Sequence, residues 1–201
     1  MSEKPISWLF SRRSVRRFLN QPVPQSVINL LLEAAIQAPS AHNHQPARYA
    51  VIQDPGQKRL LAEAMGAAFL KDLLSDGQPP GEAQAQVERS QRRINQAPLA
   101  ILVLLERRSL DIYPDEPRQQ AEYLMAVQGV AMAAENLLLA AHYLDLGAVW
   151  LCAPLFTPET ARKALDLPAS WEPQGLILIG YPAQYPEKRV RYEVADVARF
   201  Y

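Results

Sequence analysis

Residues 99–105 read LAILVLL, seven apolar side chains in succession. A run of this length without alternation is typical of a strand that is covered on both faces, so we expect a central strand of a sheet here. The next long segment, residues 119–144, is rich in Ala, Leu and Met with little polar interruption. This composition predicts a long helix that is apolar nearly all round and largely buried. Gly147 is expected to end that helix.

Shorter patterns before and after the strand at 99–105 and the helix at 119–144 predict the other helices and strands. Apolar residues at helical spacing predict a helix over residues 25–37. Proline, turn and composition signals predict the elements that are given below. Thr157 is expected to cap its helix through the hydroxyl, with Pro158 at the first helical position. The polar segment 82–95, which follows the loop at 75–81, is expected to be a solvated helix, mobile or a lid. The remaining expected elements are helices at 58–74 and 157–165 and strands at 49–52, 148–151 and 176–181. Four strands separated by helices imply a layered mixed α/β or α+β domain.

Composition limits the class of protein. The chain has 201 residues, of which 49% are hydrophobic and 21% charged, and these values suit a single globular domain spanning residues 1–201. With 21 basic and 21 acidic residues the net charge is zero, so we expect neither a nucleic acid nor a membrane as partner. The single cysteine, Cys152, cannot form an internal disulfide, and a cytoplasmic location is therefore expected.

Basic residues are nevertheless concentrated at two places. Residues 11–18, SRRSVRRF, carry Arg12, Arg13, Arg16 and Arg17 around Ser14. Arginine forks and a hydroxyl suit recognition of a phosphate or a polarised carbonyl, although the same pattern also fits a solvated helix end. A second group comes after the last expected strand, and together the two could clamp one phosphate from two sides. That group contains Lys188, Arg189 and Arg191.

The loop at residues 38–49, APSAHNHQPARY, is the other polar concentration. Its amide side chains offer the paired donor and acceptor that grip the edge of a heterocycle, but the loop also fits a polar turn that caps the preceding helix. A zinc pair from His42 and His44 lacks partners, because His142 lies in the apolar helix and no cysteine is near. No metal site is therefore expected. Cys152 has no basic neighbour and is interpreted as structural.

Taken together, three segments resemble the nitroreductase family of flavin enzymes. They are residues 12–16 (RRSVR), 38–46 (APSAHNHQP) and 179–182 (IGYP) with the basic residues that follow. The resemblance covers nearly the whole chain. It implies an α+β fold with a mixed sheet flanked by helices, and an intertwined homodimer that binds FMN without a covalent bond at the subunit interface.

The resemblance also implies roles for individual residues. Arg12, Arg13 and Ser14 would contact the flavin phosphate and ribityl chain, while Arg16 would approach the pyrimidine edge as an electrostatic stabiliser. Which of the three later basic residues completes the phosphate site stays open. The remaining cofactor-binding positions implied are Ser40, Ala41 and Asn43 in the loop, Cys152, Ala153 and Leu155 after a strand, and Lys188, Arg189 and Arg191 near the end. Ala41 replaces a residue that is often serine, and Pro154 has no amide hydrogen, so the hydrogen bond to flavin N(5) must come from a neighbour.

The activity implied is a flavin-dependent NAD(P)H oxidoreductase with no dedicated acid or base, since the flavin carries the chemistry. NADH or NADPH would reduce FMN, which would reduce a planar organic acceptor. His42, His44 and Arg48 are weaker candidates for substrate contact. Because residues 75–77, 96–98, 165–173 and 180–181 also resemble the flavin-binding carboxy-terminal domain of deazaflavin-coenzyme glutamyl ligases, one alternative is reduction of a dehydro precursor of deazaflavin coenzyme F-420. That anionic substrate would need basic residues such as Arg48, Arg92 and Arg93. A non-catalytic flavin-binding protein and flavin fragmentation are further alternatives.

Overall fold

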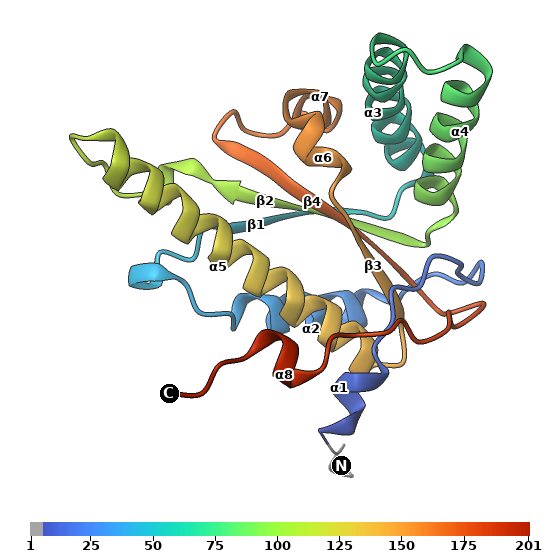
Figure 1. Cartoon of the computed structure of the whole chain (residues 1–201). Coiled ribbons are helices and arrows are strands. Elements are labelled where there is room, and N and C mark those ends of the chain that lie inside the picture. The colour runs from blue at the N-terminus through green and yellow to red at the C-terminus, as the bar shows by residue number, and fades with distance from the viewer. Residues whose placement is uncertain (1–5) are drawn as a thin grey trace.

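The computed structural model describes residues 6–201 and contains one four-stranded antiparallel sheet between two layers of helices (Figure 1). The strands lie in the order β1-β2-β4-β3. Their bounds are Ala47–Ile52 for β1, Leu99–Glu106 for β2, Gly147–Leu151 for β3 and Trp171–Gly180 for β4. The longer helices are α2 (Gln25–Ile36), α3 (Pro55–Ser75), α4 (Pro80–Gln96), α5 (Glu116–Tyr143) and α7 (Pro158–Ala164). Short helical segments are α1 (Ser7–Ser11), η1 (Ala41–Asn43), η2 (Arg107–Ser109), α6 (Ala153–Phe156) and α8 (Val194–Val197).

The expected α+β class is confirmed, and so is the central position of the run at 99–105. Successive β2 side chains enter two different cores: Ile101 packs toward α2 and α5, and Leu102 packs toward α3, α4 and α7. All seven residues are fully buried. The four strands pair only antiparallel, and the parallel part of the sheet in the described residues is the isolated bridge between Ser14 and Ala148.

The long helix α5 begins and ends at other residues than expected. Asp115 caps its start by accepting a hydrogen bond from the Arg118 amide at 3.0 Å. Its end is made by Asp145, whose φ of 59° is left-handed, so the expectation that Gly147 ends the helix is wrong. Gly147 already belongs to β3, where an added Cβ would lie 2.6 Å from a methyl carbon of Val15. This glycine allows a close approach between two segments rather than a helix end.

Only part of α5 is buried, which corrects the expectation of a largely buried helix. One face packs on the sheet and α2, whereas Leu124 and Met132 on other faces are 52% and 41% exposed. By length and composition α5 could cross a membrane, but here it is the core helix of a globular layer. Among residues 6–201, no second layer of helices covers the outer apolar side chains Leu124 and Met132.

Two further elements differ from the pattern. The helix predicted over residues 157–165 is present as α7, but the Thr157 hydroxyl does not make the expected capping hydrogen bond. The short helix α6 comes directly before it, and Thr157 lies at the junction of the two helices. Helix α4 is not fully solvated, since Ala83, Val87 and Ile94 are buried and α4 packs along α3.

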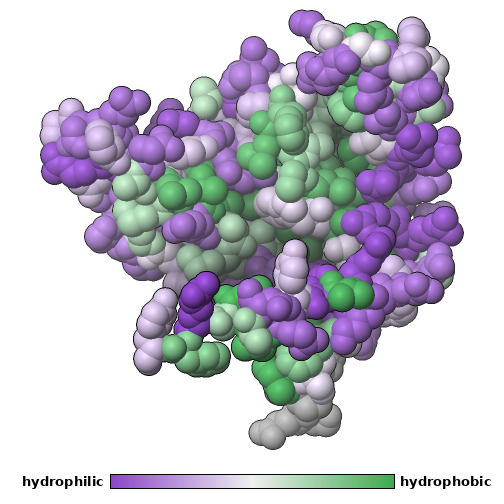
Figure 2. Space-filling model, in the orientation of Figure 1, coloured by the Kyte–Doolittle hydropathy of each residue, from purple (hydrophilic) through white to green (hydrophobic). Residues whose placement is uncertain are grey.

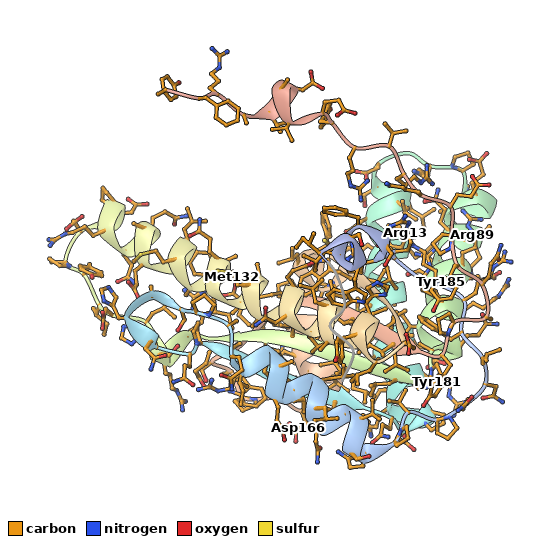
Figure 3. All side chains as sticks on the ribbon, turned by 90° about the horizontal axis from the view of Figure 1, so that it is seen from below. Arg13, Arg89, Met132, Asp166, Tyr181 and Tyr185 are labelled. Carbon is orange, nitrogen blue, oxygen red and sulfur yellow. The ribbon has the colours of Figure 1, made fainter. Side chains whose placement is uncertain are left out.

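After β4 the chain leaves the body as an arm, residues 184–201. Figure 3 shows α8 and the residues after it standing clear of the other helices. Hydrophobic side chains along the arm are nearly fully exposed, with Val190 at 95%, Tyr192 at 83% and Phe200 at 88%. Exposed aromatic and aliphatic groups in such a number indicate a surface that another molecule covers.

Candidate functional site

The basic segment near the start of the chain is held in an extended form beside the sheet. The Val15 amide donates to the carbonyl of Ala148 in β3 at 3.0 Å, and Val15 is 1% exposed. Further along, the Leu19 amide donates to the Tyr181 carbonyl at 2.8 Å. The structure therefore brings the first and last predicted segments, around residues 14 and 181, together beside β3.

The arginines of this segment have donors to spare. Arg13 donates one terminal nitrogen to the carbonyls of Phe10 and Arg12 at 2.7 and 2.8 Å, and Arg16 donates to the Ser14 carbonyl at 3.1 Å. Each guanidinium carries five N–H donors, so most remain available. Among the described residues, neither Arg13 nor Arg16 forms an ion pair with a carboxylate, and Arg12 reaches Glu135 only at 4.0 Å. The arginines therefore form a positively charged surface suited to a phosphate, and their N–H donors fit the phosphate group of FMN.

The second basic group lies on the arm. Lys188, Arg189 and Arg191 are all exposed, and no hydrogen bond or ion pair within residues 6–201 joins them to the segment at 12–16. Their proposed share in the phosphate site therefore stays a prediction.

The segment after β3 presents the positions predicted to pass the flavin ring. The Leu155 amide already donates to the Cys152 carbonyl at 3.0 Å, so it does not replace the hydrogen that Pro154 lacks. Among the predicted positions, the amides of Cys152 and Ala153 remain, and Ala153 is the one directly before Pro154. Cys152 is exposed and its sulfur accepts the Trp150 indole N–H at 3.1 Å, so the thiol is in contact with the side chain of β3 rather than with a base.

A cavity of about 510 Å³ adjoins this segment, between α3, α4 and α6. Its wall includes Ala153 itself, and Phe156 beside it is 81% exposed. Figure 2 shows hydrophobic residues gathered in the middle of this face, with polar residues around them. The apolar wall is made by Met65, Phe69, Leu73, Ile94 and Phe156, and the charged wall by Asp72, Asp76, Arg89 and Arg93.

The loop around Ser40 is shaped by backbone strain and polar contacts. His42, Asn43 and Gln45 all have positive φ, at 51°, 56° and 47°, a region that residues other than glycine rarely occupy. The Ser40 hydroxyl accepts the Gln45 amide at 2.9 Å. Ser40 also lies against Gly129 of α5, where an added Cβ would come within 3.4 Å.

This loop does not meet the basic segment within one chain. No hydrogen bond or ion pair in the part of the chain that the structure describes joins residues 38–46 to residues 12–16 or 152–155. Figure 1 places η1 near one end of α5 and α1 near the other. The cofactor positions predicted from the resemblance therefore form two groups, one with Arg12 to Arg16 and Cys152 to Leu155, and one with Ser40, Ala41 and Asn43.

The predicted substrate contacts are also divided. His42 is exposed, and its ring centroid lies 5.5 Å from that of His44. Arg48 donates to the carbonyls of Gln45 and Ala47 at 2.9 Å and lines a cavity of about 110 Å³ beneath the loop, not the cavity beside Ala153. Of the basic residues considered for an anionic substrate, only Arg93 lines the cavity beside Ala153, and Arg92 is exposed outside it.

Two polar groups near the loop are missed by the sequence patterns. Tyr49 has a buried hydroxyl without a hydrogen-bond partner, and burial raises its pKa to about 12. Glu122 is 2% exposed inside α5. Neither type of residue stands out in an apolar strand or helix, and only the packing reveals that each polar atom is enclosed.

Comparison with known proteins gives consistent matches. The model of the nitroreductase family matches residues 9–181. An NADH dehydrogenase of Thermus thermophilus is 31% identical over 201 residues, which cover 90% of this chain and 89% of that protein. A Desulfovibrio desulfuricans protein with a crystal structure in complex with FMN is 30% identical, with a TM-score of 0.73 over 98% of this chain and 96% of that chain. A BluB-like flavoprotein of Clostridium difficile 630 has a TM-score of 0.83 over 100% of both chains, and at 21% identity this shows a shared fold alone.

Proposed function

This chain belongs to the nitroreductase family, and we propose that it works as a homodimeric FMN-dependent oxidoreductase that takes hydride from NADH or NADPH and reduces a planar organic acceptor. The observation that carries the proposal is the set of available arginine donors at residues 12–16, fixed beside β3 by the hydrogen bond from the Val15 amide to Ala148. The flavin, when bound, supplies the hydride and electron transfer.

The residues of this chain would bind and orient the cofactor. Arg12, Arg13 and Ser14 would hold the phosphate and ribityl chain, and Arg16 would keep a positive charge at the pyrimidine edge. Positive charge placed there before the reaction favours electron transfer into the ring without rearrangement. The Ala153 amide would donate the hydrogen bond that Pro154 cannot. No acid or base of this chain is required.

Residues 38–46 would complete the site from a second subunit. Within one chain this loop stays apart from the arginine segment, and the two groups can serve one flavin if they come from different copies. Exposed apolar residues on α5, such as Met132, and on the arm, such as Tyr192 and Phe200, supply surfaces that a partner would cover. We propose that Lys188, Arg189 or Arg191 then reaches the phosphate, and that the dimer acts in the cytoplasm, as the single unpaired Cys152 favours.

The 510 Å³ cavity beside Ala153 would receive the acceptor. Its apolar wall suits a planar ring, and this volume lies within the usual range for small-molecule sites. Arg89 and Arg93 are balanced there by Asp72 and Asp76, so the cavity offers no net positive charge to a large anionic substrate. The charge balance favours a neutral acceptor over the deazaflavin-coenzyme precursor.

The first test is the absorption spectrum of the purified protein, recorded anaerobically before and after addition of NADPH and then of a quinone. We expect a flavin spectrum that bleaches with NADPH and recovers with the quinone. A protein without bound flavin would contradict the cofactor assignment. Flavin that bleaches with neither NADPH nor NADH would identify a non-catalytic flavin-binding protein. Recovery with the deazaflavin-coenzyme precursor but not with quinones would replace the proposed acceptor by the narrower one.

The dimer is tested separately by sedimentation of the full chain. Met132→Asp places a charge on the exposed face of α5, and we expect it to give monomers that lose flavin. Leu60→Asp is the matched control, because Leu60 is 48% exposed on α3, away from the proposed interface. A wild-type monomer that retains flavin would contradict the shared site.

A further inference from the structure

A buried carboxylate in α5 lacks a partner for one of its oxygens. Glu122 is 2% exposed. Its Oε1 accepts the Asp111 amide at 3.2 Å, but its Oε2 is buried without a hydrogen bond. No lysine or arginine among residues 6–201 forms an ion pair with it. A buried charge in this state is costly unless a cation or a donor meets it.

Two other side chains of types that can bind a metal ion, His44 and Asp111, lie close to Glu122. His44 Nε2 lies 3.1 Å from Asp111 Oδ2, and one ligand atom from each of the three residues lies within 4.8 Å of the other two. His44 and Glu122 also line a cavity of about 10 Å³, which is the room that one water-sized particle needs. Its wall is formed by Ala41, His44, Pro46, Ser109, Leu110, Glu122 and Ala126.

We propose that His44, Asp111 and Glu122 bind one divalent transition-metal ion, with Zn²⁺ as the fitting example. In a tetrahedral site with bonds of about 2.0–2.2 Å, ligand atoms lie roughly 3.4 Å apart. The His44 and Asp111 atoms, at 3.1 Å, are already near that separation, and a set that lies within 4.8 Å closes on an ion with side-chain shifts of about 1 Å. Two carboxylates and a neutral imidazole balance a charge of +2. The imidazole favours Zn²⁺ over Mg²⁺, which prefers oxygen ligands and retains water.

The loop that carries Asp111 is already fixed in position. The Gln119 side chain of α5 donates to the Asp111 carbonyl at 3.2 Å and accepts the Tyr113 amide at 3.0 Å. The Asp111 side chain remains 51% exposed, so an ion can enter from solvent and reach the buried Glu122 oxygen last.

The bound ion would attach the strained loop to the start of α5. His44 follows the left-handed His42 and Asn43, and Ser40 and Asn43 in the same loop are predicted to reach the flavin of the partner subunit. The inference itself does not depend on that role, because binding of the ion is measured without turnover. The sequence alone predicts no metal here, since Asp111 is 67 residues from His44 along the chain.

The test is calorimetric titration of Zn²⁺ into the full chain, as purified with its cofactor and then dialysed against EDTA. We expect one ion per chain, a higher melting temperature at saturation, and much weaker binding of Mg²⁺. Asp111→Asn changes an exposed side chain, so it tests the site without endangering the fold. Glu122→Gln tests the buried ligand at unchanged size.

Each variant should weaken Zn²⁺ binding by more than about tenfold. His42→Asn is the matched control: it removes a histidine from the same loop, asparagine tolerates its left-handed backbone, and we expect its Zn²⁺ affinity to equal that of the wild type. Hydrogen exchange of residues 41–46 should slow with Zn²⁺ in the wild type and not in Asp111→Asn. The proposal would be overturned if Zn²⁺ did not bind stoichiometrically. It would also be overturned if Asp111→Asn and Glu122→Gln both bound Zn²⁺ as tightly as the wild type. A spectrum without flavin would contradict the proposed function only, since Zn²⁺ binding is measured independently.

Discussion

The two ends of α5 are built in different ways. Near its carboxyl end, the segment that carries the arginines is held by hydrocarbon packing, with Val15 1% exposed and seated against Gly147. Toward its amino end, the loop that runs from Ser40, at the middle of the helix, to His44, near Glu122, is held by the Ser40 hydroxyl, left-handed backbone and the His44–Asp111 contact. Close packing fixes a segment in one place because a shift either opens a cavity or causes overlap. Polar contacts at a surface leave a loop adjustable.

This difference matches what each end is proposed to do. The arginine segment would form the part of the flavin site that belongs to the same chain, and it can be ready before the cofactor arrives. The loop would reach a flavin held by another copy, so its final position depends on assembly. Strain in a loop at such a position is common at functional sites, where surrounding contacts maintain it.

The largest expected effect breaks the packed end. Gly147→Ala places a Cβ 2.6 to 2.7 Å from Val15 side-chain carbons, so we expect unfolding stability to fall by about 2 to 3 kcal/mol and flavin to be lost in proportion. Thermal unfolding and the flavin content of the purified protein measure both. Gly81→Ala is the control, because nothing lies within 4 Å of its added Cβ. Equal destabilisation in the two variants would show that the close approach at Gly147 is not the cause.

The next effect concerns the loop end at high pH. Burial raises the pKa of Tyr49 to about 12, against an ordinary value of 10, so the folded state keeps a proton that the unfolded state loses. Stability therefore falls as pH rises from about 10 to about 12, by at most about 2 to 3 kcal/mol. Tyr49→Phe removes this part of the loss. Denaturant unfolding of both proteins at pH 8 and pH 11 measures this. Between these pH values, the free energy of unfolding should fall less in Tyr49→Phe than in the wild type, and an equal fall in both proteins would contradict the burial of the hydroxyl.

A smaller effect tests the arginines directly. Arg16→Ala should weaken FMN binding by about tenfold or slow anaerobic reduction by NADPH to a similar extent, because a charged donor is worth about 1.5 kcal/mol. Arg17→Ala is the matched control, since the Arg17 guanidinium contacts Gln184 and is not among the predicted flavin contacts. Fluorescence titration gives the affinity and stopped-flow absorbance gives the rate. If Arg16→Ala leaves both unchanged, Arg16 has no part in the site.

The smallest effect sharpens the contrast by relieving strain at the loop. Gln45 has a φ of 47°, and Gln45→Gly should raise unfolding stability by about 0.5 kcal/mol, since glycine adopts this region without a clash. Gln45→Val should lower it, because a branched Cβ is the least suited to left-handed backbone. Chemical denaturation of the two variants measures the difference, and a reversed order would mean that the backbone is not strained.

Much of the fold could be predicted because the signal is local. Residues 99–105 have apolar side chains at every position, so both faces of a strand must be covered, and both are. The end of α5 was less predictable, because either Asp145 or Gly147 could adopt the backbone that ends a helix. Only the contact with Val15 shows why the glycine was needed elsewhere.

A candidate site could be proposed from the sequence where several residues of one kind gather. The arginines at 12–16 form a recognisable cluster, and the structure places them on one edge of the sheet. Glu122 gives no such signal, since a single acid in an apolar helix is common. Its relation to His44 and Asp111 exists only after the chain has folded. The proposed dimer surface on α5 also could not be predicted from the sequence. Met132 lies in an apolar helix like its buried neighbours, and only the fold shows that no other element of residues 6–201 covers it.

The attachment of the basic segment to Ala148 and Tyr181 sets an order of events during synthesis. Residues 12–19 leave the ribosome well before their hydrogen-bond partners, which are made more than a hundred residues later. At typical translation rates of about 5–20 residues per second, the segment waits for roughly 7 to 30 seconds before these partners exist. The arginines at 12–16 therefore spend that interval without β3 beside them, and the proposed flavin site can close only after Tyr181 has been made.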